Sequence, residues 1–232
     1  ISALILARRG EKPVAKAMRP LGGVPLLSYT LETASRAESL TRVVVSTDCD
    51  AVADLALKTG AQVLRRPAEL AGPLVHDLPV VVHALEHLDA KDDDLVVLLR
   101  PTAPFRRRGE VDYVVRLMRD WPEVASIRAV VRGHSPQKLY REAGFRGLPY
   151  TALVPYSPFH QANGPRQALE PVWKPCGLID AVRAQWPLVG SLEGPLIAAY
   201  QVQPERAIDI DDEDDWAAAE GQMQRPGVWG WK

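Results

Sequence analysis

The feature that most constrains the fold of this chain is a regular alternation of apolar runs and amphipathic stretches between residues 2 and 131. The first run, residues 2–7, is uninterrupted, which is typical of a strand buried on both faces of a sheet. We expect further strands at residues 42–46, 62–64, 95–99 and 124–131, and helices at residues 25–37, 48–60, 77–88 and 110–120. Strands that alternate with helices predict an α/β fold, in which helices cover both faces of a mainly parallel sheet.

The loops that follow the predicted strands are the expected place for a binding site. In an open α/β sheet, ligands bind beyond the carboxyl ends of the strands. Four loops, at residues 8–23, 46–50, 66–76 and 100–106, come after predicted strands. We therefore expect these four loops to line one cleft.

Residues 133–175 interrupt the alternation with a proline-rich stretch that has little periodicity. A long irregular segment in a compact protein is usually functional or packs on a partner. After this stretch the α/β pattern resumes, with apolar runs and a final helical pattern at residues 178–181, 197–202 and 212–222. We therefore predict a core of residues 1–132 and 176–232 that carries an inserted arm, residues 133–175.

Composition excludes several classes of protein. Hydrophobic residues make up 47% of the 232 residues and charged residues 25%, and the formal net charge is −1. A chain without a net positive field has no general attraction for nucleic acid or for a membrane surface. No apolar run approaches the roughly 18 residues of a membrane span. The two cysteines, Cys49 and Cys176, lie far apart in the sequence, which favours a reducing, cytoplasmic location over a disulfide framework.

The loop after the first predicted strand concentrates positive charge. Its residues include Ala7, Arg8, Arg9, Gly10, Lys12 and Lys16. Arginine and lysine neutralise phosphate oxygens, and glycine lets backbone N–H groups approach them, so the loop suits a polyphosphate. The loop fits neither the Rossmann nor the Walker glycine pattern. A solvated basic loop is therefore the alternative interpretation.

Asp209 and Asp211 alternate with two isoleucines, Ile208 and Ile210. On an extended segment, both carboxylates face one side and both isoleucines face the other. Two close carboxylates repel each other unless a cation joins them, and Mg²⁺ prefers one or two carboxylates together with substrate phosphates. The alternative is an acidic N-terminus for the helix predicted at residues 212–222, which explains the acidic run but not the alternation.

Further polar residues could form a pocket for an acidic acceptor. Arg100 follows a predicted strand, Lys138 lies in the arm, and Arg166 and Gln167 lie near its end. From the residues alone, each of these side chains could equally be an ordinary surface group.

Several sequence blocks together resemble the acylneuraminate (CMP-sialic acid) cytidylyltransferase family, which includes enzymes for related 3-deoxy-ulosonic acids. The blocks that carry the resemblance are Ala7-Arg8 with Lys12 and Lys16, residues 19–27, residues 42–48, residues 66–71, residues 101–106, residues 165–167 and residues 206–211. They follow the family's order and span nearly the whole chain.

The resemblance implies a three-layer, Rossmann-like nucleotidyltransferase core and an arm that reaches into a second subunit, giving a homodimer. It implies a transferase that moves CMP from CTP to a nonulosonic or ulosonic acid and releases pyrophosphate, with Mg²⁺ as the cofactor.

The resemblance also implies roles for single residues. Arg8, Lys16 and Arg66 resemble residues that hold the CTP phosphates, within a nucleotide-binding set that also includes Ala7, Arg9, Gly10 and Lys12. Asp209 and Asp211 match the magnesium-binding pair and, with Lys16, form the expected catalytic set. Lys138 and Arg166 resemble residues that fix the carboxylate of the acceptor, next to Gln167 and Arg100.

Several positions depart from the family pattern, including the turn at residues 72–76, which is rich in serine and threonine in the family. Arg100 replaces a glutamine, Asp180 replaces a tyrosine, Cys176 replaces an asparagine, and Ala17 replaces an asparagine in a shortened first loop. An arginine adds a bidentate fork for a carboxylate or a phosphonate. Two alternatives therefore stay open: a cytidylyltransferase for a small phosphonate such as phosphonoformate, and a catalytically silent nucleotide-binding homologue.

Overall fold

The computed structural model describes residues 1–10, 14–133, 136–143, 152–156, 165, 167 and 169–225. Its contacts divide the chain into two compact units, residues 1–130 with 176–232 and residues 131–175. No helix in the described part of the chain is long and apolar enough to cross a lipid bilayer. Cys49 and Cys176 are both free thiols.

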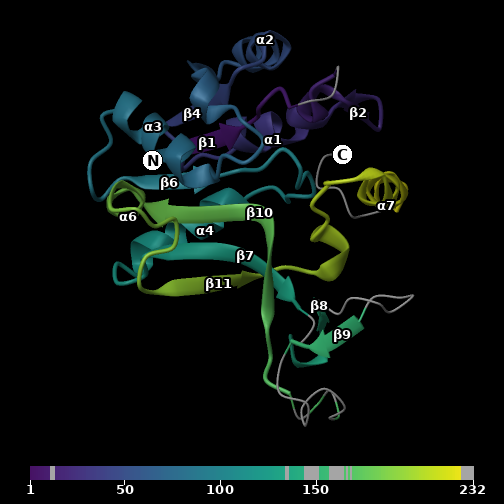
Figure 1. Ribbon diagram of the computed structural model, residues 1–232. Coiled ribbons are helices and arrows are strands. Elements are labelled where there is room, and N and C mark those ends of the chain that lie inside the picture. Colours follow the sequence, from purple (N-terminus) through teal and green to yellow (C-terminus); the bar gives the residue numbers. More distant parts are fainter. Residues whose placement is uncertain are drawn as a thin grey trace. The chain divides into compact units, whose positions relative to one another are not determined.

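In the described part of the first unit, strands form one sheet in the order β11-β7-β10-β6-β1-β4-β5 (Figure 1). The strands are β1 (Ser2–Leu6), β4 (Arg42–Thr47), β5 (Gln62–Arg65), β6 (Leu95–Leu98), β7 (Ser126–Arg132), β10 (Trp173–Arg183) and β11 (Ile197–Gln201). The central strand β1 is parallel to both β4 and β6, and β7 is parallel to β11. Only β10 runs antiparallel to its described neighbour β6, so the mainly parallel sheet is confirmed.

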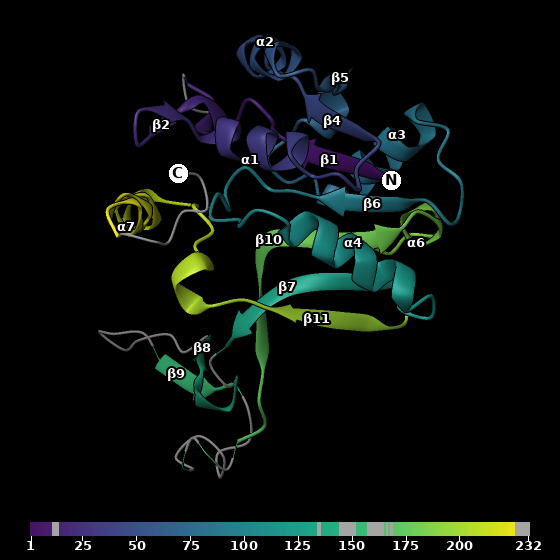
Figure 2. The same cartoon turned by 180° about the vertical axis from the view of Figure 1, so that it is seen from behind.

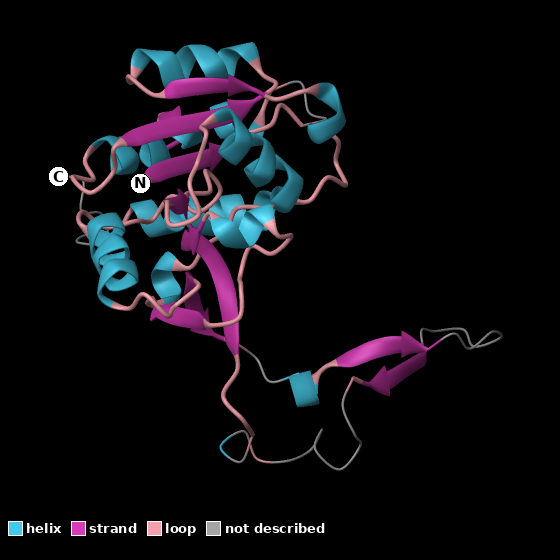
Figure 3. Ribbon diagram, turned by 90° about the vertical axis from the view of Figure 1, so that its left-hand side faces the viewer, coloured by secondary structure: helices cyan, strands magenta, loops and turns pink. Residues whose placement is uncertain are grey.

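Helices cover both faces of this sheet. They are α1 (Leu26–Ser35), α2 (Asp50–Lys58), α3 (Asp77–His87), α4 (Glu110–Asp120) and α6 (Gln185–Leu188), while α7 (Glu213–Met223) packs beside α1. Figure 1 shows α3 and α6 in front of the sheet, and Figure 2 shows α1 and α4 on the opposite face. The view in Figure 3 shows the strands of this unit between helices on both sides. The predicted three-layer α/β architecture is thus confirmed.

The core under α3 explains why the central strands are mainly apolar. Leu4 of β1, Val96 of β6 and Val81 of α3 belong to one buried cluster, and each is at most 2% exposed. Because helices bury both faces of the sheet, residues 3–6 of β1 are all apolar.

Some elements differ from the sequence prediction. The loop at 8–23 contains a short 3₁₀ helix, η1 (Lys16–Met18), and β2 (Pro20–Leu21) pairs with β3 (Val24–Pro25). The 3₁₀ helices η2 (Ala68–Leu70) and η5 (Pro204–Arg206) were also not predicted. The predicted strand at 178–181 is the middle of a longer strand, β10, because the apolar pattern marks only its buried part.

The second unit contains regular structure that the sequence pattern did not indicate. The strands β8 (Tyr140–Ala143) and β9 (Ala152–Pro155) form an antiparallel pair, preceded by the 3₁₀ helix η3 (Pro136–Lys138). Gly133 donates a backbone hydrogen bond to the carbonyl oxygen of Val172 at 2.9 Å, which joins the two ends of the unit.

A small second core holds the C-terminal segment of the first unit in place. Ile210 and Trp216 pack with Leu26, Tyr29 and Phe105, and Ile210 is 1% exposed. The helix α7 begins with a capping box, in which the carboxylate of Asp212 accepts from the Asp215 backbone N–H at 2.9 Å. The segment that precedes α7 is therefore fixed on both sides of Asp211.

A buried ion pair also anchors the segment before α7, residues 206–211, to the start of α4. The guanidinium of Arg206 lies 2.6 Å from the carboxylate of Glu110, and both residues are buried. The hydroxyl of Tyr200 donates to the same carboxylate at 2.8 Å. Burial and this hydrogen bond raise the pKa of Tyr200 to about 12.

We expect Arg206→Met to lower the free energy of unfolding by about 3–5 kcal/mol, because it leaves the Glu110 carboxylate buried without its cation. The matched control is Asp50→Asn, which breaks a pair with Arg65 whose side chains are 87% and 58% exposed. An exposed pair of this kind contributes about 0–1 kcal/mol. Urea unfolding followed by circular dichroism measures both, and equal losses would show that the Arg206 pair is not buried in solution.

Candidate active site

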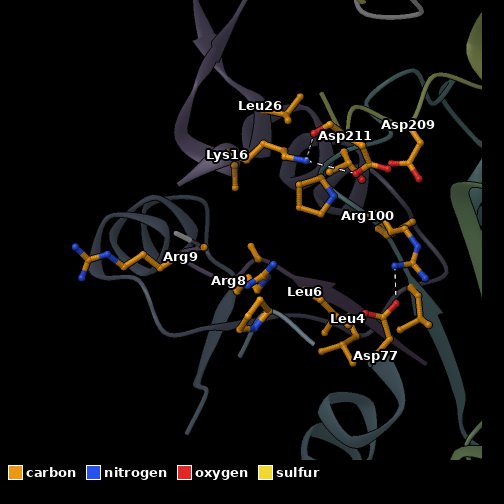
Figure 4. A pocket seen from close by; sticks show the side chains of 18 residues that line it. Leu4, Leu6, Arg8, Arg9, Lys16, Leu26, Asp77, Arg100, Asp209 and Asp211 are labelled. Atoms are coloured by element: carbon orange, nitrogen blue, oxygen red, sulfur yellow. Dashed lines mark hydrogen bonds and ion pairs between the residues drawn. The ribbon is translucent and has the colours of Figure 1, made fainter. Parts of the chain in front are cut away.

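A cavity of about 650 Å³ opens at the carboxyl ends of β1 and β6 (Figure 4). Its polar wall comes from four parts of the first unit: the loop after β1, η1, the loop after β6 with the start of α3, and the segment before α7. The residues that line it are Leu4, Leu6, Ala7, Arg8, Arg9, Gly10, Lys16, Ala17, Leu26, Pro73, Asp77, Leu98, Leu99, Arg100, Pro101, Thr102, Asp209 and Asp211.

The loop after β1 supplies the cationic side of the cavity. Ala7, Arg8, Arg9 and Gly10 all line it, and Gly10 has a φ of +72° that suits glycine. The backbone N–H of Arg9 donates to the carboxylate of Asp48 at 2.7 Å, which ties this loop to the end of β4. In Figure 4 the side chain of Arg9 extends away from Asp209 and Arg100. Lys12 lies outside the described residues.

Lys16 connects the cationic loop to the acidic segment. Its ammonium group donates to the carbonyl oxygens of Ile210 and Asp211, at 3.0 Å each, and to the Asp211 carboxylate at 3.4 Å (Figure 4). Residues that lie almost 200 positions apart in the sequence therefore form one wall.

Asp209 and Asp211 both line the cavity, while Ile208 and Ile210 pack into the small core. The Ile210 backbone N–H donates to the carbonyl oxygen of Thr102 at 2.8 Å, which holds the segment beside the loop after β6. The N-terminus of α7 is capped by Asp212 and Asp215. Helix capping thus accounts for those two carboxylates and not for the carboxylates of Asp209 and Asp211.

The donor set of this acidic pair fits a divalent cation. The Oδ1 atom of Asp209 is buried and has no hydrogen-bond partner among the described residues, whereas the Asp211 side chain is 78% exposed. A buried carboxylate oxygen without a partner is costly, so a cation beside it would be stabilising. Within the described ranges, no group of three or more His, Cys, Asp or Glu side chains converges. Two carboxylates that share a site with phosphate oxygens are a usual Mg²⁺ environment.

Arg100 lies at the opposite end of the cavity from Arg9. Its guanidinium is 2.5 Å from the Asp77 carboxylate and 3.9 Å from that of Asp180. Burial acts to lower the pKa of Arg100, but the carboxylates of Asp77, Asp180 and Asp209 outweigh it and raise this pKa.

The loop that carries Arg100 is fixed by a fully buried cation, Arg106. The guanidinium of Arg106 donates to the carbonyl oxygen of Arg100 at 2.7 Å, to the Thr30 hydroxyl at 3.0 Å and to the carbonyl oxygen of Leu178. Burial lowers the pKa of Arg106 to about 9. This side chain joins the loop after β6 to α1 and to β10.

Arg66 does not line the cavity. It is buried and donates to the carbonyl oxygen of Ser46 at 2.9 Å and to its hydroxyl at 3.2 Å, because it turns back towards the end of β4. Burial lowers its pKa, against the opposing charges of Asp48 and Asp77. In this structure Arg66 joins β4 to the loop after β5. Arg66 is not among the residues that line the cavity, and its contact with a nucleotide stays a prediction.

The other predicted acceptor residues all belong to the second unit, residues 131–175. Lys138 ends η3 in the second unit, Gln167 belongs to the same unit, and Arg166 lies outside the described residues. Their contact with an acceptor stays a prediction.

The loops that line the cavity differ in part from the four loops expected from the sequence. Residues 46–50 contribute no lining residue, and residues 66–76 contribute only Pro73. The loop at 46–50 supports the site indirectly, through the Asp48 carboxylate that holds Arg9.

Sequence reasoning missed Asp77 and Gly177. Asp77 is the first residue of α3, where an acidic side chain reads as an ordinary helix start. Gly177 lies inside β10 with a φ of +68°, and a Cβ atom there would lie 2.8 Å from Cδ of Arg100 and 3.2 Å from Oδ2 of Asp209. A glycine within an apolar strand is the one sequence signal for such a close approach.

Comparisons with known proteins identify what the chain is similar to. The protein family described as cytidylyltransferase matches residues 2–140. The N-acylneuraminate cytidylyltransferase of Escherichia coli O18:K1:H7 is 29% identical over 221 residues, which cover 94% of this chain and 51% of that protein. The CMP-N,N'-diacetyllegionaminic acid synthase of Legionella pneumophila is 34% identical over 122 residues, which cover 50% of this chain and 52% of that protein.

The chain spans about half the length of the curated relatives it matches. Among solved structures, CMP:2-keto-3-deoxy-manno-octonic acid synthetase complexed with CTP aligns with a TM-score of 0.64 at 18% identity, covering 95% of this chain and 97% of that chain. A 4-diphosphocytidyl-2C-methyl-D-erythritol synthase aligns with a TM-score of 0.62 at 10% identity, covering 96% and 99%. At these identities the structural similarity supports the fold.

We expect Gly177→Ala to destabilise the protein more than Gly60→Ala. Both glycines have positive φ, but a Cβ atom at Gly60 meets nothing within 4 Å. The left-handed conformation costs about 1–2 kcal/mol at either position, and overlap with Arg100 and Asp209 adds about 1–3 kcal/mol at Gly177. Urea unfolding measures the difference. Equal losses would mean that Gly177 is required for its backbone conformation alone.

Proposed function

The chain belongs to the cytidylyltransferase family, and we propose that it transfers CMP from CTP to a small sugar acid and releases pyrophosphate. The observation that supports this most directly is the cavity itself, where a cationic loop faces a pair of carboxylates. Its volume of about 650 Å³ lies within the usual range of small-molecule sites. The match of residues 2–140 to the family and the alignment with a synthetase bound to CTP support the same nucleotide.

The proposed chemistry is a displacement at the α-phosphorus of CTP. An oxygen of the acceptor forms the new bond to phosphorus, and the bond between the α-phosphorus and the bridging oxygen breaks as pyrophosphate leaves. Little covalent work falls to the protein in such a reaction, because positioning and charge neutralisation lower the barrier. Arg8 and the backbone N–H groups near Gly10 would hold the phosphates.

Asp209 and Asp211 would hold Mg²⁺, as the buried and unpartnered Oδ1 of Asp209 suggests. When bound, the ion would neutralise charge on the phosphate oxygens and act as a Lewis acid. Lys16 keeps Asp211 beside the cationic loop through its contacts with residues 210 and 211. The same ammonium group is therefore placed at the edge of the cavity where the phosphates would bind.

For the acceptor we propose a nonulosonic or ulosonic acid. The relatives named for N-acylneuraminate and for N,N'-diacetyllegionaminic acid support this substrate class. The phosphonate alternative depended on Arg100 as an available cation, and Arg100 is paired with Asp77. No observation favours a silent homologue, since Lys16, Asp209 and Asp211 meet at one cavity.

We also propose that the arm at residues 133–175 forms a homodimer. The described part of this segment exposes several large apolar side chains, namely Leu139, Tyr140, Leu153, Tyr156 and Trp173. Exposed aromatic and large apolar side chains are typical of the buried centre of an interface.

We expect Asp209→Asn to lower the rate of pyrophosphate release by at least about 100-fold, as the loss of a group that stabilises transition-state charge does. The assay contains CTP, Mg²⁺ and N-acetylneuraminate or 3-deoxy-manno-octulosonate. The matched control is Asp212→Asn, because asparagine caps a helix as well as aspartate does. Similar rates for the two variants would exclude Asp209 from catalysis. CTP binding without turnover of any sugar acid would favour the silent homologue.

We expect the unmodified chain to sediment as a dimer and Leu153→Asp to sediment as a monomer, because a charge in an apolar interface is left without a partner. Leu57→Asp is the matched control, since Leu57 of α2 is 60% exposed and Leu153 is 59% exposed. Sedimentation velocity measures both. A dimer that persists in Leu153→Asp but is lost in Leu57→Asp would locate the interface on the core instead.

A further inference from the structure

Five charged side chains of alternating sign form a network of ion pairs that begins at the cavity wall. Asp77 pairs with Arg100 at 2.5 Å, and Arg100 lies 3.9 Å from Asp180. Asp180 lies 3.3 Å from Arg128, which pairs with Glu193 at 2.5 Å. Only the first two, Asp77 and Arg100, line the cavity. Asp180 stands behind them with a side chain that is 10% exposed.

Two residues of this network come from distant parts of the sequence. Arg100 and Asp180 belong to different sequence blocks, eighty positions apart. Asp180 of β10 is paired with Leu98 of β6 across the sheet, which brings its carboxylate to the arginine two residues further on. Arg100 and Asp180 carry opposite charges 3.9 Å apart, so each partly neutralises the charge of the other.

The consequence is that Arg100 is not an available cation. Its guanidinium lies between two carboxylates, and the charge of Asp209 also acts on it. A dianion that approached Arg100 would meet the Asp77 carboxylate at the same point and would have to displace it. Separating a half-buried ion pair is costly, because each ion loses its partner where water cannot fully replace it.

The pair nevertheless offers fixed hydrogen-bonding groups to a ligand. Arg100 presents N–H donors, and Asp77 presents carboxylate oxygens that accept. Neutral groups that both donate and accept, such as hydroxyls and amides, satisfy such a surface without a change in net charge. Compact dianions satisfy the arginine only and repel the aspartate.

We propose that the Asp77–Arg100 pair selects acceptors that carry neutral hydroxyl or amide groups on the portion facing it and rejects compact dianions, and that Asp180 is the positioning residue for Arg100. This inference rests on the proposed CMP transfer, and it assigns the discrimination between acceptors to residues from α3, the loop after β6 and β10.

The test compares three acceptors with the full chain, CTP and Mg²⁺: N-acetylneuraminate, 3-deoxy-manno-octulosonate and phosphonoformate. We expect a value of kcat/KM for at least one sugar acid that exceeds that for phosphonoformate by about 100-fold or more. Asp77→Asn should narrow this preference by about 10-fold or more, because it leaves a polar partner missing for the sugar acid and frees Arg100 for the dianion.

The separation of KM from kcat identifies what Arg100 does. Arg100→Gln should raise the KM for the sugar acid by about 10-fold, while the KM for CTP and kcat change by less than about twofold. Arg100→Lys keeps the charge but lacks the bidentate fork, so it should restore only part of the affinity. Equal increases in KM for CTP and for the acid would contradict a role in acceptor selection.

A double-mutant cycle tests the positioning role. If Asp180 acts through Arg100, the variant with both Arg100→Gln and Asp180→Asn should have the same acceptor KM as Arg100→Gln alone. Glu193→Gln, at the exposed outer end, should leave the acceptor KM unchanged. Additive effects of Arg100→Gln and Asp180→Asn would refute the positioning role. Thermal melting checks that each variant is folded. If Asp180→Asn does not fold, the acceptor preference of Asp77→Asn, at the cavity surface, still tests the selectivity of the Asp77–Arg100 pair.

The outcomes separate the two proposals. Pyrophosphate release that is as fast with phosphonoformate as with the sugar acids would overturn this inference and leave CMP transfer standing. No release with any of the three acids would overturn the proposed function, and this inference with it.

Discussion

The cavity depends on one constraint, the anchoring of residues 206–211 against the carboxyl edge of the sheet. This segment comes late in the chain, yet it supplies both carboxylates that face the loop after β1. Burial of Ile210, the Arg206–Glu110 ion pair and the hydrogen bond from Ile210 to Thr102 hold it there. Apolar and ionic contacts fix the backbone, and both aspartates line the cavity. The chemistry of the site is therefore built on interactions that take no part in it.

Two cations of the cavity, Lys16 and Arg100, already have partners within the protein. Lys16 is bound to the segment at residues 210 and 211, and Arg100 is bound to Asp77. Such pairing reduces the cost of holding several like charges near one another in a half-buried space. On binding a nucleotide, Lys16 would therefore exchange its protein partners for phosphate oxygens. At Arg100 the exchange is less favourable, because carboxylates lie on two sides of the guanidinium.

The fold was largely predictable from the sequence because its strands and helices obey simple periodicities. The helix at residues 110–120 and the strand beginning at residue 2 were located closely, since burial of one face or of both faces leaves a clear pattern. The antiparallel direction of β10 was not predictable, because strand direction depends on the path of the chain and not on the local pattern. The short pair β2–β3 was also missed, since two-residue strands carry no periodicity.

The two ends of the candidate site also differ in how far they could be predicted from the sequence. Residues 7–10 are contiguous, so the charge that would meet phosphates is visible as a local cluster. The other end is assembled from Asp77, Arg100 and Asp180, which belong to three separate elements. No sequence separation signals that they touch, and Arg100 alone suggested an available cation for an anionic acceptor. Its carboxylate partners reverse that conclusion, because the same arginine that appeared to attract a dianion is the centre of a neutralised network.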